Sequence, residues 1–416
     1  MRQIVCITAL LWIALLGTAR AQEAPPDIGY TAHRADGNRL VSGVGGFPDV
    51  TAYRVPMPVP VAYLVPVPGR AAWVAIDFEG RAFHLALGNG GLTAREIDAP
   101  RAPRPTPYLD EAGTLRFAPA IEDASPLVPA VRYGDSWLVV GENGDLLRAD
   151  VDGTILQRWA LNLAPDVVPV VSEQARVAVY AEATDARYVH NIMGDRLEHA
   201  GLAVLAPAED GTLQLIGRVA LPGDQVFEGL SPLWADVTAD STPDLITTVS
   251  DGRNGAQVQV YAASGALLAT GPAIGQGLRW RHQLAWGPFG ADGENGLVEV
   301  LTPHIGGVVG FFSLQDATLV RAAALPGYTS HIINDRNVDM AVAGDFNGDG
   351  TPEIVLPNQA RDRVAGLQVS GATFVEVWSL PVEGQVITNL AATTILGDRL
   401  ALAVGTQESI YMWVPG

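Results

Sequence analysis

Oxygen-bearing side chains recur at alternate positions in one segment of the chain, GDFNGDGTPEIV (344–355), and a further carboxylate, Glu353, closes the pattern. Carboxylate, amide and main-chain carbonyl oxygens are the ligands that Ca²⁺ prefers in proteins. Paired glycines within the segment permit the sharp backbone reversal that such a loop needs. We therefore expect a Ca²⁺ loop, with the ligands Asp345, Asn347, Asp349, Thr351 (through its main-chain oxygen) and Glu353.

This loop is not an EF-hand. An EF-hand loop places a bidentate carboxylate at its twelfth position, and here that position, counted from Asp345, is Leu356. The residues on both sides, including Val342 before the loop and Ile354 after it, have the pattern of strands and not of helices. The alternative to a metal site is a turn rich in Asp and Asn that caps the end of a strand.

Two further segments occupy the corresponding place in their repeats, and only one of them keeps this arrangement. The segment 288–296 has lost it, because Pro288 and Gly290 occupy the first two ligand positions and only Asp292 is well placed. The segment ADVTADSTPDLI (235–246) keeps it, and it provides a second possible Ca²⁺ site. The ligands expected there are Asp236, Thr238, Asp240, Thr242 (main chain) and Asp244.

The elements that position these loops are short strands in repeated units. Residues 230–273, 282–327 and 338–382 each read as four apolar strands separated by Gly, Asp, Asn and Pro. Asp236 and Asp345 are two periods of about 54 residues apart, close to the period of a propeller blade. Looser copies precede these units, one of which carries an insertion at 184–201 that we expect to form a loop on one face.

The last repeat, 389–416, contains only three strands, whereas the stretch 38–55 has no repeat of its own. A closed ring needs a fourth strand there, because an open edge would be exposed. We therefore predict an all-β, seven-bladed β-propeller of four-stranded blades, with the ring closed by this N-terminal strand. Six or eight blades, or a pair of β-sandwiches, are the alternatives.

The pattern Asp-x-Asn-x-Asp-Gly-x-x-Glu-Ile-Val between two strands resembles the FG-GAP/VCBS repeat of integrin α-subunit-like propellers. The resemblance is clearest at 230–382, and it implies a Ca²⁺ loop between the first two strands of a blade. Its last ligand is usually Asp, so Glu353 departs by one methylene. A weaker resemblance, at 141–161, is to quinoprotein-type propeller repeats, which supports the ring and not a quinone cofactor.

Composition limits the function. An apolar run after Arg2 and small residues before Ala21 predict a signal peptide at 1–21, with an N-terminal membrane anchor as the alternative. A flexible segment at 22–37 and a single propeller at 38–416 would follow. The chain has one cysteine, Cys6, no lysine and a formal charge of −19, which argues against thiol or lysine catalysis and against nucleic-acid binding.

No catalytic motif is visible among the seven histidines, His33, His84, His190, His199, His282, His304 and His331. His282 and His331 precede adjacent repeats, and with Asp335 and Arg336 they could form a site on one rim or simply be polar connections. Trp234, Trp286 and Trp378 lie within strands, where packing between blades is favoured over sugar binding.

We therefore expect an exported, monomeric, Ca²⁺-stabilised propeller that binds a protein or a glycan at the cell surface, without a catalytic site. A carbohydrate-active lyase or hydrolase on the same ring is the alternative, and an acidic, His and Tyr cluster at the central channel would favour it.

Overall fold

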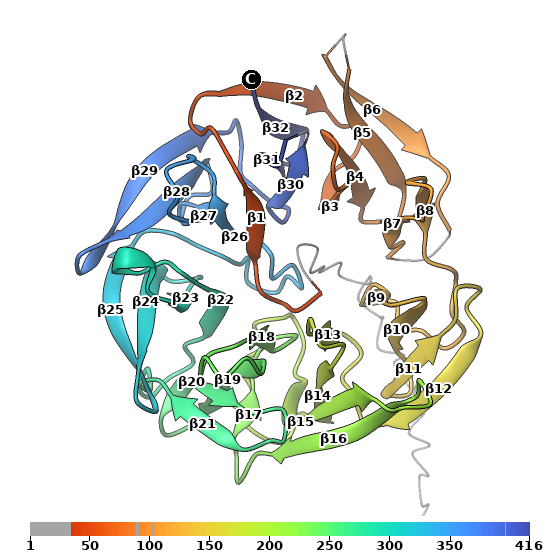
Figure 1. Cartoon of the computed structure of the whole chain (residues 1–416), viewed down its shortest axis with the longest axis vertical. Coiled ribbons are helices and arrows are strands. Elements are labelled where there is room, and N and C mark those ends of the chain that lie inside the picture. The colour runs from red at the N-terminus through yellow and green to blue at the C-terminus, as the bar shows by residue number, and fades with distance from the viewer. Residues whose placement is uncertain (1–34, 89–90, 101–103, 396) are drawn as a thin grey trace, which may run out of the picture.

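The protein is an all-β propeller. The computed structural model describes residues 35–88, 91–100, 104–395 and 397–416, so the predicted signal peptide lies outside the described residues. Figure 1 shows the strands arranged as successive sheets around a ring. In the described part of the chain, the only helical segment is one 3-10 turn, η1 (Ala291–Gly293), and no helix is long and apolar enough to cross a membrane.

The first half of the ring contains three four-stranded antiparallel units and one two-stranded sheet. Successive strands pair within each unit. In chain order the strands are β3 (Val61–Pro66), β4 (Ala72–Asp77), β5 (Ala82–Gly88) and β6 (Gly91–Ile97); the hairpin β7 (Pro107–Leu109) and β8 (Leu115–Phe117); β9 (Val131–Tyr133), β10 (Ser136–Val140), β11 (Asp145–Ala149) and β12 (Ile155–Ala160); and β13 (Val170–Val171), β14 (Val177–Thr184), β15 (Glu198–Pro207) and β16 (Leu213–Ala220).

The second half continues the same meander. A short strand, β17 (Val226–Phe227), pairs with both β15 and the following unit. The units are β18 (Leu233–Ala235), β19 (Asp244–Asp251), β20 (Gly255–Tyr261) and β21 (Leu267–Thr270); β22 (Arg281–Gly287), β23 (Gly296–Leu301), β24 (Val308–Gln315) and β25 (Thr318–Pro326); β26 (Val342–Asp345), β27 (Glu353–Pro357), β28 (Arg363–Ser370) and β29 (Thr373–Pro381); and β30 (Ala391–Ile395), β31 (Arg399–Gly405) and β32 (Ser409–Pro415).

The predicted closure of the ring is confirmed. β2 (Val50–Pro56) pairs antiparallel with β32 along its whole length, from Val50 opposite Pro415 to Pro56 opposite Ser409, and so supplies the fourth strand of the last unit. The blade number of seven stays a prediction, because the two-stranded sheet β7–β8 has its own place in the ring between β6 and β9 (Figure 1).

Burial explains why the strands differ in composition. Inner strands such as β4, β19 and β22 are buried at every position, so their side chains do not alternate between buried and exposed, and the polar residues of β19 and β22 are buried together with the apolar ones. Outer strands such as β12 alternate between half-buried and exposed residues, as expected for a strand with one face in water. The core therefore lies between neighbouring sheets, and the three tryptophans named above are buried in it, 2–7% exposed.

Candidate functional site

The acidic loop between β26 and β27 is held by its own polar groups. The carboxylate of Asp345 accepts hydrogen bonds from Gly348 N (2.8 Å) and Gly350 N (3.1 Å). Glu353 is completely buried, and it accepts a hydrogen bond from Phe346 N at 2.7 Å. Burial raises the pKa of Glu353 to about 7. The two glycines have φ of 80° and 88°, a region that glycine adopts without steric cost.

A side chain from the neighbouring strand fills this loop. Gln368 of β28 places its Nε2 atom 3.1 and 3.0 Å from the two carboxylate oxygens of Asp349, 3.0 Å from the Thr351 carbonyl oxygen and 3.3 Å from Oε1 of Glu353. An amide nitrogen carries two hydrogens, so it can satisfy only two of these four oxygens at once. Three of the five predicted Ca²⁺ ligands therefore surround one point, and an amide nitrogen occupies that point.

The other two predicted ligands face elsewhere. Asn347 exchanges hydrogen bonds with Asp349, and Asp345 is engaged by the two glycine N–H groups. In the described residues, no group of three or more His, Cys, Asp or Glu side chains is placed to hold a metal ion. The donor set thus fits Ca²⁺ in its chemistry, but binding would have to displace the Gln368 amide and draw Asp345 inward.

The second acidic loop, between β18 and β19, has the same turn. Asp236 accepts hydrogen bonds from Asp240 N and Ser241 N, both at 3.0 Å, which parallels the bonds of Asp345. Asp240 in turn accepts a bond from Thr242 N at 2.7 Å. This loop and the first therefore share their backbone frame.

The interior of the second loop differs. Asp244 accepts hydrogen bonds from Val237 N and from both N and Oγ1 of Thr238, at 3.1–3.2 Å, and burial raises its pKa. The β19–β20 register pairs Leu245 with Tyr261, which puts Ala262 opposite Asp244 where Gln368 stands opposite Glu353. The third segment, which we expected to have lost its site, forms η1 with Asp292 at φ 55°.

A strap formed by residues 35–44 crosses the inside of the ring. The carbonyl of Ala35 accepts a hydrogen bond from Val171 N, and that of Asp36 accepts one from Trp234 N. The strap then forms β1 (Leu40–Val44), which pairs parallel with β26 and β31. Figure 1 shows β1 running from the middle of the ring outward beside β26.

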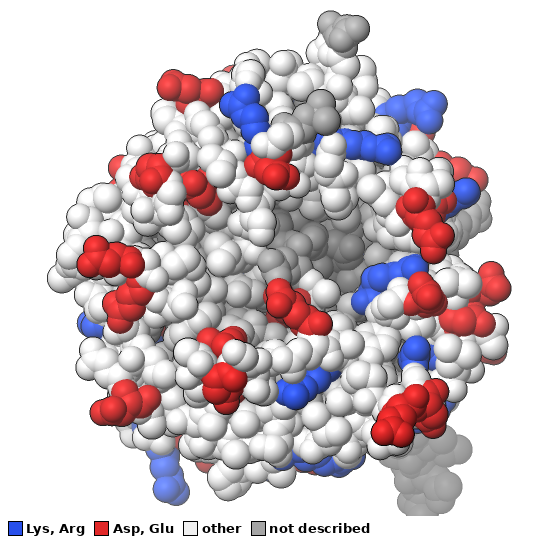
Figure 2. Space-filling view, in the orientation of Figure 1, with Lys and Arg blue, Asp and Glu red and all other residues white. Residues whose placement is uncertain are grey.

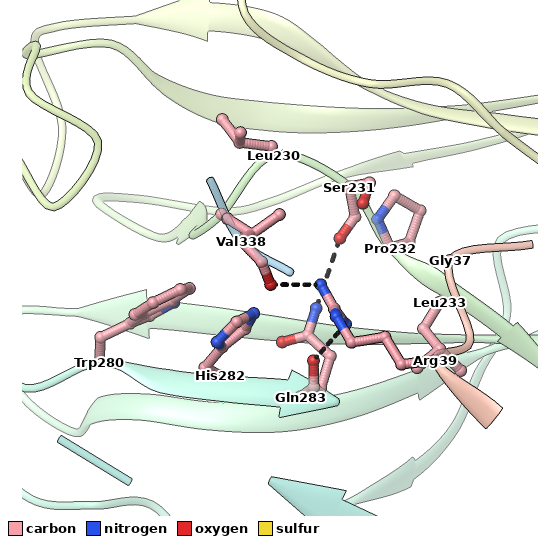
Figure 3. Close-up of a pocket in the computed structure, with 11 residues that line it drawn as sticks. Gly37, Arg39, Leu230, Ser231, Pro232, Leu233, Trp280, His282, Gln283 and Val338 are labelled. Carbon is pink, nitrogen blue, oxygen red and sulfur yellow. Dashed lines mark hydrogen bonds between the residues drawn. The ribbon is translucent and has the colours of Figure 1, made fainter. Parts of the chain in front are cut away.

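Arg39 anchors this strap. Its guanidinium donates to Oδ1 of Asp339 at 2.8 Å and to the carbonyl oxygens of Val338 and Gln283 at 2.9 and 3.1 Å. Figure 3 shows Arg39 reaching between Gln283 and Val338, with Trp280 and His282 on the same wall. The space that remains beside these residues is about 10 Å³, which is room for about one water molecule.

Three histidines and a tryptophan form a cluster next to this cavity. The Trp280 ring stacks on His282 with centroids 4.4 Å apart and contacts His331 edge-on at 5.1 Å. His331 Nε2 lies 2.6 Å from the carbonyl oxygen of Asp335, so it must donate there. Its Nδ1 atom then accepts from Nε2 of His304 at 2.7 Å. Burial lowers the pKa of His304 to about 4 and that of His331 to about 3, so both are neutral at pH 7.

Buried carboxylates lie beside this cluster. Glu228 is completely buried; it contacts Nδ1 of His190 at 2.7 Å and accepts a hydrogen bond from Ser250 Oγ. Glu198 accepts a hydrogen bond from His190 N at 3.4 Å. Burial, followed by the charge of Glu228, raises the pKa of Glu198 well above its ordinary value. A buried carboxyl group with a raised pKa beside a histidine is a candidate for proton transfer.

The insertion between β14 and β15 brings these groups together, and it forms a loop as expected. Arg336, on the β25–β26 connection, donates to Asp166 at 2.9 Å and to Asp195 of the insertion at 2.5 Å. Asn334 N also donates to Ile192 O at 2.9 Å. The predicted rim loops therefore do meet, and Arg336 joins them. His282 and His331 contact each other edge-on, with ring centroids 6.3 Å apart, and both contact Trp280.

An open groove lies on the opposite side of the strap. It has a volume of about 560 Å³ and is lined by Trp234, Trp286 and polar residues of the strap and of the loops before β14, β19 and β23. The polar residues include three carboxylates and three amides, from Asp36, Asn38, Glu173, Gln174, Asp236 and Asn295.

Reasoning from the sequence missed Arg39, Glu198, Glu228 and Gln368. Of these residues, only Gln368 could have been found from the sequence, because the expected pairing of the second and third strands of a blade places it opposite Glu353. The carboxylates and histidines of the buried cluster come from segments far apart in the chain, and nothing in their local pattern marks them.

Two solved structures are similar to this chain. The chain is similar to a quinohemoprotein alcohol dehydrogenase from Comamonas testosteroni, with a TM-score of 0.56 and 11% identity over 95% of this chain and 81% of the other. It is also similar to BamB from Moraxella catarrhalis, with a TM-score of 0.42 and 12% identity over 90% and 96% of the two chains. No family model matches the sequence, and no curated protein is similar to it in sequence.

The class that the fold defines is therefore the β-propeller, a scaffold that hosts both binding proteins and enzymes. At this identity the likeness shows the fold alone. The resemblance to the FG-GAP/VCBS repeat stays a prediction.

Proposed function

We propose that the protein is an exported, Ca²⁺-stabilised propeller that binds a glycan in the groove lined by Trp234 and Trp286. The observation that carries this proposal is the lining of the groove. Trp234 and Trp286 are 2% and 7% exposed and contribute only their edges, so the amide and carboxylate groups of the groove are the main surface for the hydroxyls of a sugar. The volume of about 560 Å³ accommodates a short oligosaccharide.

The charge of the groove indicates which class of sugar it would bind. The groove is lined by three carboxylates and, among the described residues, by no arginine, so neutral sugars are favoured over acidic ones. Figure 2 shows acidic groups dispersed around the visible face with arginines between them. The overall charge of −19 therefore does not form one continuous acidic field on that face.

The alternative, a polysaccharide lyase or hydrolase, has one observation in its favour: the buried cluster of His190, Glu198 and Glu228. It is the weaker candidate, because these carboxylates are 5% exposed or less and the cavity beside neighbouring His282 holds about one water. A substrate sugar needs a cavity of several hundred Å³.

A glycan array followed by titration calorimetry tests the proposal. We expect binding of neutral oligosaccharides, weakened at least about tenfold by Asn295→Ala together with Gln174→Ala. Gln276→Ala, which removes an exposed amide outside the groove, is the matched control. Binding unaffected by the groove variants, or capture of a protein and no glycan, would contradict the proposal. Release of shortened sugars from polysaccharides would favour the enzyme instead.

A further inference from the structure

A second open groove, of about 550 Å³, lies between the first four-stranded unit and the hairpin β7–β8. Arginines line it from both sides: Arg70 and Arg95 from the first unit and Arg116 from β8. His84 stands directly opposite Arg95 in the β5–β6 register. Positive side chains from three separate strands or turns thus face one space.

The arginines are only partly engaged by the protein. Arg95 makes no hydrogen bond or ion pair within the described residues and is exposed. Arg116 pairs with Asp110 through Nε at 3.1 Å, and no bond of its two amino groups is found in the described part of the chain. Arg70 donates to Gly113 O at 2.9 Å, a bond that joins the hairpin to the first unit. Guanidinium N–H groups therefore remain available to a ligand.

This concentration of positive charge is unusual for the chain. Its formal charge is −19, and several arginines elsewhere pair with carboxylates, as Arg158 does with Asp145 and Asp123. Asp98 is the one carboxylate among the described residues that line the groove, against three arginines. The glycan groove has the opposite lining, so the two sites are independent of each other.

We propose that this groove binds the oxyanion of a small ligand, namely a carboxylate, sulfate or phosphate group on a sugar-sized body. Guanidinium groups match such oxyanions because their N–H donors form a planar fork. Phe117 and Leu115 of β8 add an apolar surface for the body of the ligand. The volume suits a molecule of one to three rings. The site does not depend on the proposed glycan function.

His84 provides a local reporter. Burial lowers its pKa, and the charges of Arg95 and Arg70 lower it further. The charged groups that line the groove with it are Arg70, Arg95, Arg116 and Asp98. An anion bound among them offsets the arginines, so it raises the pKa of His84, which NMR titration of the imidazole measures.

The experiment titrates the full chain with galacturonate, inorganic phosphate and sulfate, with neutral galactose as the blank. Calorimetry gives the affinity, and the His84 signal, assigned with His84→Gln, places the ligand. We expect at least one anion to bind and to raise the His84 pKa. Arg95→Ala should weaken binding at least about tenfold, and Arg95→Lys should weaken it less, because it keeps the charge without the fork. Arg253→Ala, an exposed arginine remote from the groove, is the control.

The three anions distinguish the source of the oxyanion. Binding of galacturonate alone assigns a carboxylate ligand, whereas binding of phosphate or sulfate assigns a tetrahedral one. The proposal is overturned if no anion shifts the His84 signal, or if Arg95→Ala binds as tightly as Arg253→Ala.

Discussion

The loops at 345–353 and 236–244 have the same spacing of oxygen-bearing residues, but their interiors differ. Both begin with an aspartate that accepts two backbone N–H bonds. In the first, Gln368 supplies an amide nitrogen to three of the predicted ligands; in the second, Ala262 stands opposite Asp244 and supplies nothing. The comparison teaches that a ligand pattern determines the frame of a loop, while a residue on the next strand determines what fills it.

The largest expected difference between the loops is in stability. Glu353→Ala empties a fully buried position and removes the closer acceptor of the Phe346 N–H and a partner of Gln368, so we expect a loss of about 3 kcal/mol in the free energy of unfolding. Asp244→Ala should cost about 1.5 kcal/mol, because the bonds of Asp244 are longer, at 3.1–3.2 Å. Urea unfolding of both variants measures the difference. Equal losses would mean that Gln368 does not distinguish the loops.

Calcium should stabilise the protein through both loops, and more through the first. A ligand whose free concentration is about 100 times its Kd adds about 2.7 kcal/mol to the free energy of unfolding of a protein with one binding site. We expect the melting temperature to rise in Ca²⁺ relative to EGTA, with Mg²⁺ as the control, and Asp345→Ala to remove most of that rise. Asp236→Ala should remove the smaller part. An unchanged melting temperature in EGTA would refute the calcium proposal.

The pH dependence of stability should separate the loops as well. Because Glu353 titrates near pH 7 in the folded protein and at 4.5 unfolded, the folded state holds an extra proton between these values. The free energy of unfolding therefore falls as pH rises across this window, by about 3 kcal/mol. Other buried carboxylates, such as Asp166 with a pKa of about 6, contribute in the same range. The contribution of Glu353 is the part of the pH dependence of the free energy of unfolding that is lost in Glu353→Gln. Both proteins are measured in EGTA.

Ca²⁺ should reverse this dependence, since it favours ionised Glu353. A slope that is the same in wild type and Glu353→Gln would contradict the assignment.

Exchanging the two interior residues tests the comparison most directly and with the smallest effect. Gln368→Ala removes the amide that Ca²⁺ must displace, so we expect Ca²⁺ to bind the first loop about five- to tenfold more tightly, or about 1 kcal/mol. Ala262→Gln should weaken binding at the second loop by a similar factor. Calorimetry in each variant gives both constants. Weaker binding in Gln368→Ala would instead identify Gln368 as a ligand through Oε1.

The sequence predicted the parts of the structure that repeat or that are local. The four-strand period and the three-stranded final repeat were enough to predict the ring and its closure by the stretch 38–55. The path of the strap was not predictable, because Leu40 pairs with Ala343 in a parallel contact that no local pattern encodes. The buried cluster could not be predicted for the same reason, because His190, Glu228 and His304 come from connections far apart in the chain and meet only in the folded ring.

The seam between β2 and β32 bears on how the protein is made. During synthesis β2 (Val50–Pro56) emerges well before its partner β32 (Ser409–Pro415), which follows it only after the other blades have been made. Until then β2 is an unpaired strand edge, which is a template for association with other chains. A chain that stops before β32 cannot close the ring, because β2 and β31 then both lack the strand that pairs with them. Such a product should be recognised by chaperones and proteases through those open edges.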